Sequence, residues 1–549
     1  MSVQRQQVVA NGRLNGHAEK MACMNPGTGE QFAEVTMATA AEVSAARQEM
    51  GVAAQVWGHK LVAERVRIVR QLQSLIIEEM DELTAVINQD GGKSRQDALT
   101  ELFVTVDSMN QYCRHAAQWL RPRRVSSGLQ LFKRGQVERR PYGVVAVISP
   151  WNYPFILTMQ PVITALLAGN TVVVKPSEVT AATGVAMEKL FQRLPELAPF
   201  VRFVHGDSRV GAALVQTRPD LIYVTGSVRT GRLITQAAAE TMTPVITELG
   251  SKDPMIVLDD ADITAAARWG VWGAFYNAGQ TCVAVERVYV LESVYEPFVQ
   301  AVLAEVANMK VGYSPAIDNG FDMGPLTFAR QGEIIDAHLA DAVAKGAKIV
   351  AGGGRSGYFM EPTVVVDVDH TMLLMQDETF GPILPIMKVA DISQAVRLAN
   401  DSYLGLGASV WGQDVARAER VAQRLETGSV NINDTVVHFA IPHLPFGGVK
   451  QSGNGRSHGE ADLLQFTQMV SYAIGKPPLP FDIATILRSP GNYHKSAAIM
   501  KLAFGTTPQQ RLEPVTEFLQ ENKGKVAMVG GITAVVLASI RLVKYWWAI

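Results

Sequence analysis

VVAVI at Val144–Ile148 and TVVVK at Thr171–Lys175 are the first two of five short apolar runs that decide the fold of this chain. The other three are VRFVH at residues 201–205, LIYVT at Leu221–Thr225 and PVITE at residues 244–248. Stretches with helical spacing separate the runs. Unbroken apolar runs that alternate with helices are typical of a parallel sheet buried on both faces. The pattern predicts an α/β fold, and the ligands of such sheets bind at the carboxyl ends of the strands.

The sequence on either side of these runs suggests further parts. Residues 42–123 show apolar side chains at helical spacing, and residues 130–139 alternate in the way that predicts a hairpin. A second strand–helix alternation runs from residue 254 to about 448, which indicates a second α/β domain. The proline-rich residues 476–480 (KPPLP) form a stiff spacer before a C-terminal tail.

Composition excludes several classes of protein. The 549 residues include 50 Lys and Arg against 52 Asp and Glu, so the basic field of a nucleic-acid binder is missing. The three cysteines, Cys23, Cys113 and Cys282, are too few and too far apart for a disulfide framework or a zinc site, which favours a reducing compartment. The histidines show no ligand spacing, so we expect no metal. Residues 1–20 carry no secretory signal.

The tail ends in an apolar stretch, VAMVGGITAVVLASI at residues 526–540, which contains no charged residue. Arg541, Lys544, Tyr545, Trp546 and Trp547 follow it and suit the interface of a membrane. We interpret residues 526–549 as a membrane segment. The alternative is a helix that packs on the body or on a partner subunit, although such a helix should have a polar face.

Polar motifs follow the predicted strands. They are SPWNYP (149–154), KPSE (175–178), TGSVRTG (225–231) and ELGSK (248–252), and NAGQTC (277–282) ends a later helical run. A Gly-Ser turn that opens a helix suits a pyrophosphate, and a glutamate beyond a strand suits a ribose hydroxyl. Each motif alone is weak: Cys282 could be inert packing, Glu248 a surface carboxylate and Asn152 a turn residue.

One glycine pattern is misleading. Gly352, Gly354 and Gly357 satisfy G-x-G-x-x-G, but the stretch YFMEP rather than a helix follows them. We therefore expect a hairpin or loop there and no dinucleotide fingerprint.

Taken together, the motifs resemble the aldehyde dehydrogenase superfamily. The resemblance runs from about Met24 (MNPGTGE) to about Phe466 and includes SPWNYPF, AGNTVVVKPSE, VTGSVRTGR, TELGSKDP, NAGQTC, QDETFGPILPI, GSVNIND and LPFGGVKQSGNGR. FGPILPI and HFAIPHLPFGGV are most similar to the fatty-aldehyde branch, which often carries a C-terminal membrane anchor. The resemblance implies oxidation of an apolar or long-chain aldehyde to a carboxylic acid through a thiohemiacetal and a thioester.

The resemblance also implies roles for individual residues. Cys282 would be the nucleophile, Asn152 with the Cys282 N–H would hold the oxyanion, and Glu248 would activate water. NAD would be the cofactor, with NADP possible, because the Glu178 carboxylate repels a 2′-phosphate and Lys175 partly offsets this. The residues implied in cofactor binding are Trp151, Lys175, Glu178, Ser227, Glu378 and Phe380.

The implied fold has a Rossmann-like NAD(P)-binding domain, a second α/β catalytic domain and a small β oligomerisation arm. The predicted boundaries are 24–127 with 142–250 for the NAD(P)-binding domain, 251–447 for the catalytic domain, 128–141 with 448–475 for the arm, 476–525 for the linker and 526–549 for the membrane segment. A homodimer or homotetramer follows by analogy. The enzyme would be membrane-associated, with its body facing the cytoplasm.

Two alternatives and one departure stay open. A CoA-acylating dehydrogenase would resolve the thioester with CoA, but Glu248 argues against this because such an enzyme needs no water-activating base. A non-catalytic member of the fold would tend to lose its chemical residues, which are all present here. The departure is Ser251, where the family usually has glycine, and it would narrow the space near the thiol or add a hydroxyl.

Overall fold

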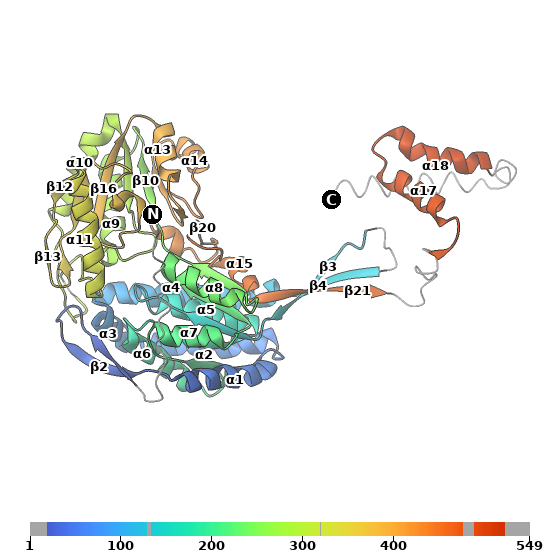
Figure 1. Cartoon of the computed structure of the whole chain (residues 1–549), viewed down its shortest axis with the longest axis horizontal. Coiled ribbons are helices and arrows are strands. Elements are labelled where there is room, and N and C mark those ends of the chain that lie inside the picture. The colour runs from blue at the N-terminus through green and yellow to red at the C-terminus, as the bar shows by residue number, and fades with distance from the viewer. Residues whose placement is uncertain (1–18, 129–132, 319, 476–487, 522–549) are drawn as a thin grey trace, which may run out of the picture. The chain divides into compact units, whose positions relative to one another are not determined.

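The structure of the chain is a computed structural model that describes residues 19–128, 133–318, 320–475 and 488–521. The chain divides into two compact units. The first comprises Met1–Arg123 with Val137–Ser471, and the second comprises Arg124–Gln136 with Tyr472–Ile549. The first unit contains two large sheets, each with helices beside it (Figure 1).

The five predicted apolar runs form one parallel sheet, which confirms the prediction. Its strands are β5 (Val144–Ile148), β6 (Thr171–Lys175), β7 (Val201–Phe203), β8 (Leu221–Thr225) and β9 (Val245–Glu248). They lie in the order β7-β6-β5-β8-β9. Counted from β5 along the chain, this order is 3-2-1-4-5, the strand order of a Rossmann sheet.

Both faces of this sheet are buried, as the unbroken apolar runs predict. Val144, Ala146 and Ile148 of β5 pack with α1, α7 and α8, whereas Val145 and Val147 pack with α2 to α6. The predicted helical stretch 42–123 is confirmed as four helices. The helices of this region are α1 (Ala40–Trp57), α2 (Val62–Glu78), α3 (Met80–Gly91), α4 (Arg95–Trp119), α5 (Ile156–Ala168), α6 (Ala181–Gln192), η1 (Ala198–Phe200), α7 (Ser208–Gln216) and α8 (Val228–Ala239).

The second alternation, predicted from residue 254 to about 448, is a seven-stranded sheet in the order β12-β15-β16-β11-β10-β18-β19. Only the edge strand β12 runs antiparallel to its neighbour. The strands are β10 (Pro254–Val257), β11 (Arg287–Leu291), β12 (Lys348–Ala351), β15 (Thr363–Val366), β16 (Ile383–Val389), β18 (Ser409–Trp411) and β19 (Asn431–Ile432). The helices are α9 (Ile263–Phe275), η2 (Tyr276–Gly279), α10 (Glu292–Val306), α11 (Ala329–Ala344), α12 (Leu373–Gln376), α13 (Ile392–Asn400), α14 (Val415–Ala422) and η3 (Val437–Ala440). The helix that follows this region, α15 (Gly459–Gln465), packs against α4 and α5.

Smaller sheets complete the description. β13 (Arg355–Ser356) pairs antiparallel with β14 (Phe359–Met360), which confirms the expected hairpin at the Gly352–357 pattern. The remaining strands are β1 (Lys20–Met24), β2 (Gln31–Thr36), β17 (Leu404–Gly405), β20 (Val449–Lys450), β3 (Arg123–Val125), β4 (Lys133–Pro141) and β21 (Thr467–Gly475). The last three form one sheet in the order β21-β4-β3. The region expected to form a hairpin therefore contributes β4.

The second unit contains two helices of the tail, α17 (Asn492–Phe504) and α18 (Pro508–Glu521), which pack against each other. An ion pair between Lys501 and Glu513 joins them at 2.8 Å. Within the described part of the chain, every helix is too short or too polar to cross a membrane. The predicted membrane segment, residues 526–549, lies outside the described residues.

Candidate active site

The motif residues meet at the carboxyl edge of the first sheet. Asn152 follows β5, and Glu248 is the last residue of β9. Because β5, β8 and β9 are parallel, their carboxyl ends lie along one edge. Cys282 lies just beyond η2, close enough to Glu248 for this carboxyl to contribute to the raised pKa of its thiol. The structure therefore brings together the three residues whose chemistry the sequence singled out.

Hydrogen bonds join the Asn152 segment to the Cys282 segment. The Asn152 Nδ2 donates to the carbonyl oxygen of Gln280 at 3.0 Å, and the Tyr153 hydroxyl lies 2.7 Å from the Thr281 Oγ1. In return, the Asn277 Nδ2 donates to the carbonyl oxygen of Asn152 at 3.1 Å. These bonds fix the side-chain amide of Asn152 beside the residues that precede the cysteine.

The loop before Cys282 has an uncommon backbone. Asn277 and Ala278 adopt φ of 53° and 55°, in the left-handed region. Asparagine tolerates this conformation, whereas alanine pays a steric cost there. Such strain persists only where surrounding contacts hold it, and it concentrates at functional sites. Here the bonds of Asn277 and Gln280 supply those contacts.

Cys282 is the accessible thiol of this chain. It is partly exposed, whereas Cys23 and Cys113 are buried. Burial in the site, together with the nearby charges of Asp253 and Glu378, raises the pKa of the Cys282 thiol well above its ordinary value. A raised pKa disfavours the thiolate, so the reactivity of Cys282 depends on groups that lower this pKa.

Glu248 is the most isolated carboxyl of the site. Its side chain is buried, and neither oxygen finds a hydrogen-bond partner among the described residues. Burial raises the pKa of Glu248 well above its ordinary value, and the positive charge of Arg456 offsets this in part. A buried carboxyl with a raised pKa suits general-base chemistry near neutral pH. Gly455 makes room for it, since a Cβ there would lie 2.6 Å from Oε1.

Ser251 is the residue at which the sequence departs from the glycine that is usual in the family. Its buried hydroxyl makes a short hydrogen bond to the Asp253 Oδ1, which also accepts the N–H of Gly407 at 2.9 Å. The hydroxyl is therefore engaged with the carboxylate behind the site. The backbone N–H of Ser251 donates to the Glu378 Oε1 at 2.7 Å.

The residues implied in cofactor binding form two groups, and the first consists of Lys175, Glu178 and Ser227. Lys175, at the end of β6, forms an ion pair with Glu178 at 2.7 Å. Ser227 caps α8 by accepting the N–H of Thr230. A Cβ on Gly226 would meet no atom within 4 Å, so there is space before the free N–H groups of α8. The strand ends and this helix terminus suit the ribose and pyrophosphate of a dinucleotide.

The second group of residues implied in cofactor binding consists of Trp151, Phe380 and Glu378. The Trp151 and Phe380 rings meet edge to face, with centroids 5.4 Å apart. Burial and the nearby Glu286 charge raise the pKa of Glu378 to about 8. A Cβ on Gly250 would lie 2.4 Å from its Oε2, so only glycine fits there without displacement.

Sequence reasoning missed the residues that hold the loop at residues 379 and 380 in place. The Glu286 carboxylate accepts the N–H groups of Thr379 at 2.8 Å and Phe380 at 2.9 Å. It also pairs with the buried Lys252 at 2.6 Å. Lys252 stands within the ELGSK motif, but Glu286 belongs to no motif, and no local signal links it to residue 380.

Apolar side chains surround the thiol. Val283, Leu406 and Phe446 form a buried cluster, against which Cys282, Val436 and Phe439 pack. The thiol therefore has the carboxyls of Glu248 and Glu378 nearby and apolar side chains beside it.

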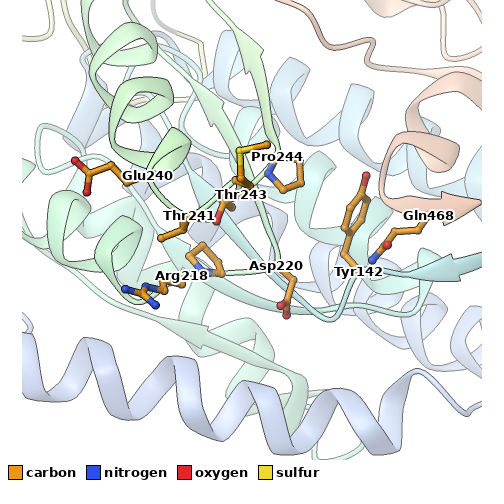
Figure 2. Close-up of a pocket in the computed structure, with 10 residues that line it drawn as sticks. Tyr142, Arg218, Asp220, Glu240, Thr241, Thr243, Pro244 and Gln468 are labelled. Carbon is orange, nitrogen blue, oxygen red and sulfur yellow. Dashed lines mark hydrogen bonds between the residues drawn. The ribbon is translucent and has the colours of Figure 1, made fainter.

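A separate hollow of about 500 Å³ lies at the other edge of the first sheet (Figure 2). Asp220 and Pro244 line it, and they immediately precede β8 and β9. The Asp220 carboxylate accepts the N–H of Val144 at 2.7 Å and pairs with Arg47 at 3.4 Å. These are structural contacts between elements, and the hollow lies at the amino ends of the strands, away from the chemistry.

The chain is similar in sequence and fold to known proteins. The Aldehyde dehydrogenase family matches residues 14–472. The chain is 42% identical over 477 residues to a 4,4'-diapolycopene aldehyde oxidase from Methylomonas sp, covering 85% of this chain and 89% of that protein. It is 36% identical over 487 residues to a putative succinate-semialdehyde dehydrogenase [NADP(+)] from Mycobacterium ulcerans (strain Agy99), covering 84% and 93%. A betaine aldehyde dehydrogenase from Staphylococcus aureus in complex with NAD+ superposes with a TM-score of 0.79 at 30% identity, covering 84% of this chain and 92% of that one.

Proposed function

This chain belongs to the aldehyde dehydrogenase family and is an NAD(P)-dependent enzyme that oxidises aldehydes; we propose that Cys282, Asn152 and Glu248 carry out the reaction through a thioester. The observation that carries this proposal is their convergence. A partly exposed thiol lies within the electrostatic reach of an unpartnered buried carboxyl and beside a fixed side-chain amide.

The first chemical step uses the thiol. After the Cys282 thiol has given its proton to solvent water, the sulfur attacks the aldehyde carbon, a C–S bond forms and the electron pair of the C=O bond moves to oxygen to give an oxyanion. The Asn152 amide has two N–H groups, of which one already donates to Gln280. The second N–H, with the backbone N–H of Cys282, would hold the oxyanion. One such donor is typically worth about 3 kcal/mol.

A nicotinamide cofactor held by the residues named below would accept the hydride. Loss of hydride from the thiohemiacetal leaves a thioester on Cys282. Glu248 then takes a proton from water, the resulting hydroxide attacks the acyl carbon, and the C–S bond breaks to give the carboxylic acid and the free thiol. The raised pKa of Glu248 supports this role, because a stronger base removes a proton from water more readily.

The cofactor contacts belong to the same proposal. Lys175 and Glu178 would bind the adenine-side ribose, Trp151 and Ser227 would line the phosphate path, and Glu378 beside Phe380 would position the nicotinamide ribose. The Glu178 carboxylate favours NAD, and the Lys175 ammonium that it pairs with keeps the preference over NADP modest.

We propose an apolar aldehyde as the substrate, long-chain as in the fatty-aldehyde branch or otherwise extended. The apolar cluster around Cys282 supports this, since an apolar chain gains free energy by leaving water for such a wall. The relative from Methylomonas is named for an aldehyde of diapolycopene. The mycobacterial relative is named for succinate semialdehyde, which carries a carboxylate.

The domain assignment and the assembly are also proposals. We assign residues 24–127 with 142–250 to cofactor binding, 251–447 to catalysis and 128–141 with 448–475 to an arm that joins subunits in a homodimer or homotetramer. Residues 526–549 would anchor the enzyme to a membrane, with the body facing the cytoplasm. If protein truncated after residue 475 still sediments with vesicles as the full chain does, the anchor is wrong.

A panel of aldehydes tests the function. Purified full-length enzyme is mixed with NAD or NADP and with straight-chain aldehydes of increasing length, and with a matched series that ends in a carboxylate. We expect kcat/KM to rise with chain length and to fall when the far end is charged. Absence of reduced cofactor with every aldehyde would refute the proposed function. Product appearing only with added CoA would establish the acylating alternative.

A further inference from the structure

Lys93 and Glu101 form an ion pair within the first unit. The Lys93 Nζ lies 2.6 Å from the Glu101 Oε1, and each side chain is only 1% exposed. Lys93 lies before α4 and Glu101 lies within it. Removing two charges from water is costly, and apolar residues of similar volume often serve stability as well or better. Stability alone therefore does not account for this pair.

Each partner also holds the segment that carries Asn152. The Lys93 Nζ donates to the carbonyl oxygen of Asn152 at 2.6 Å and lies 4.1 Å from the centroid of the Tyr153 ring. The same carbonyl accepts a bond from Asn277 at 3.1 Å. Two donors thus fix the peptide of Asn152, while its side-chain amide is directed at Gln280.

Glu101 holds the other end of the same segment. Its Oε2 accepts the N–H of Phe155 at 3.1 Å and that of Ile156 at 3.3 Å. These groups open α5, whose N-cap residue supplies no side-chain bond of its own. A carboxylate from α4 therefore caps α5, and residues 152–156 are held at both ends by one ion pair.

We propose that Lys93 and Glu101 are positioning residues, which hold the Asn152 amide where the oxyanion forms. This inference rests on the proposed function of Asn152. A hydrogen-bond donor stabilises a transition state only when it is held in place before charge develops, and a displacement of about 1 Å can cost a hundredfold in rate. The printed contacts of the ion pair reach the site through residues 152–156 and not through the thiol or Glu248 directly, so we expect its effect on the rate to pass through this segment.

The test compares Lys93→Met and Glu101→Gln with the wild-type full-length enzyme. We expect kcat to fall about 10- to 100-fold in each variant, as for a misplaced donor, with the KM for NAD(P) changed less than about 2-fold. Arg67→Met is the matched control, since it breaks an ion pair with Glu196 whose side chains are 53% and 48% exposed. That variant should keep the wild-type kcat.

A double-mutant cycle separates positioning from general structure. If Lys93 acts through Asn152, then Lys93→Met added to Asn152→Ala should lower kcat by no more than about 2-fold further. A full independent loss in the double variant would overturn the proposal. So would an unchanged kcat per folded enzyme in Lys93→Met or Glu101→Gln.

Alkylation of Cys282 by iodoacetamide gives a second readout. That reaction forms no oxyanion, so its rate in Lys93→Met should match the wild-type rate while turnover falls. A parallel drop in alkylation would show general damage to the site and would refute the positioning role. A wild-type enzyme that oxidises no aldehyde refutes the proposed function and this inference together, whereas active wild type with active variants refutes the inference alone.

Discussion

Replacing Gly455 by alanine should slow release of the acid from Cys282 while leaving its acylation almost intact. A Cβ at this position would lie 2.6 Å from the Glu248 Oε1 and 2.6 Å from the Ile246 Cγ2. Ordinary contact begins at 3.4 Å, so the carboxylate must retreat by about 0.8 Å or more. A carboxylate displaced by that distance is no longer aligned to take a proton from the attacking water. We therefore expect deacylation to slow roughly 10- to 100-fold.

Rapid mixing of enzyme, aldehyde and cofactor measures this effect. The Gly455→Ala variant should give a burst of reduced cofactor close to one per active site, followed by a slow steady state. Gly211→Ala is the control, because a Cβ there would meet no atom within 4 Å, and it should behave as wild type. An unchanged steady-state kcat would refute the role of Glu248, and so would a burst that slows by the same factor as the steady state.

Three further predictions concern single groups. Cys282→Ala should abolish turnover in an activity assay without lowering the melting temperature in thermal unfolding by more than a few degrees. Turnover by this variant would show that Cys282 is not the nucleophile. Because the pKa of Cys282 is raised, less of the thiol is ionised at a given pH than in a free cysteine, whose pKa is about 8.5. Its alkylation rate should therefore still be rising at pH values where free cysteine has levelled off, and a plateau at or below that pH would contradict the raised pKa. Glu178→Gln should raise the ratio of kcat/KM for NADP to that for NAD about tenfold, which is equivalent to about 1.4 kcal/mol from removing one nearby charge. An unchanged ratio would show that the 2′-phosphate of NADP does not bind near Glu178.

The sequence predicted the first sheet well because its signal is local. The central strands β5, β6 and β8 are buried on both faces along almost their whole length, and the edge strands β7 and β9 are partly buried. The two clusters that cover the sheet therefore produce short apolar runs in the sequence. The polar residues at the ends of β5 and β9 could then be grouped, since parallel strands place their carboxyl ends along one edge. Asn152 and Glu248 stand at these strand ends, and the resemblance to the family implied their roles.

The rest of the site depends on contacts between distant residues. Glu101 holds α5 from 54 positions away in the chain, and Glu286 holds Thr379 from 93 positions away. Neither glutamate has neighbours in sequence that distinguish it from a solvated helix or strand residue. Ser251 shows the same limit, since only the structure shows that its hydroxyl is bonded to Asp253.

The two buried ion pairs share one arrangement, which explains why charged residues suit these positions. Lys93–Glu101 supports the residues after β5, and Lys252–Glu286 supports residues 379 and 380. In each pair the glutamate accepts two consecutive backbone N–H groups. An apolar pair of equal volume could match the packing but could not accept these bonds. Phe380 adopts φ of 52°, which its backbone bond to Glu286 helps to maintain. Each ion pair therefore fixes a loop of the site at the expense of desolvating two charges.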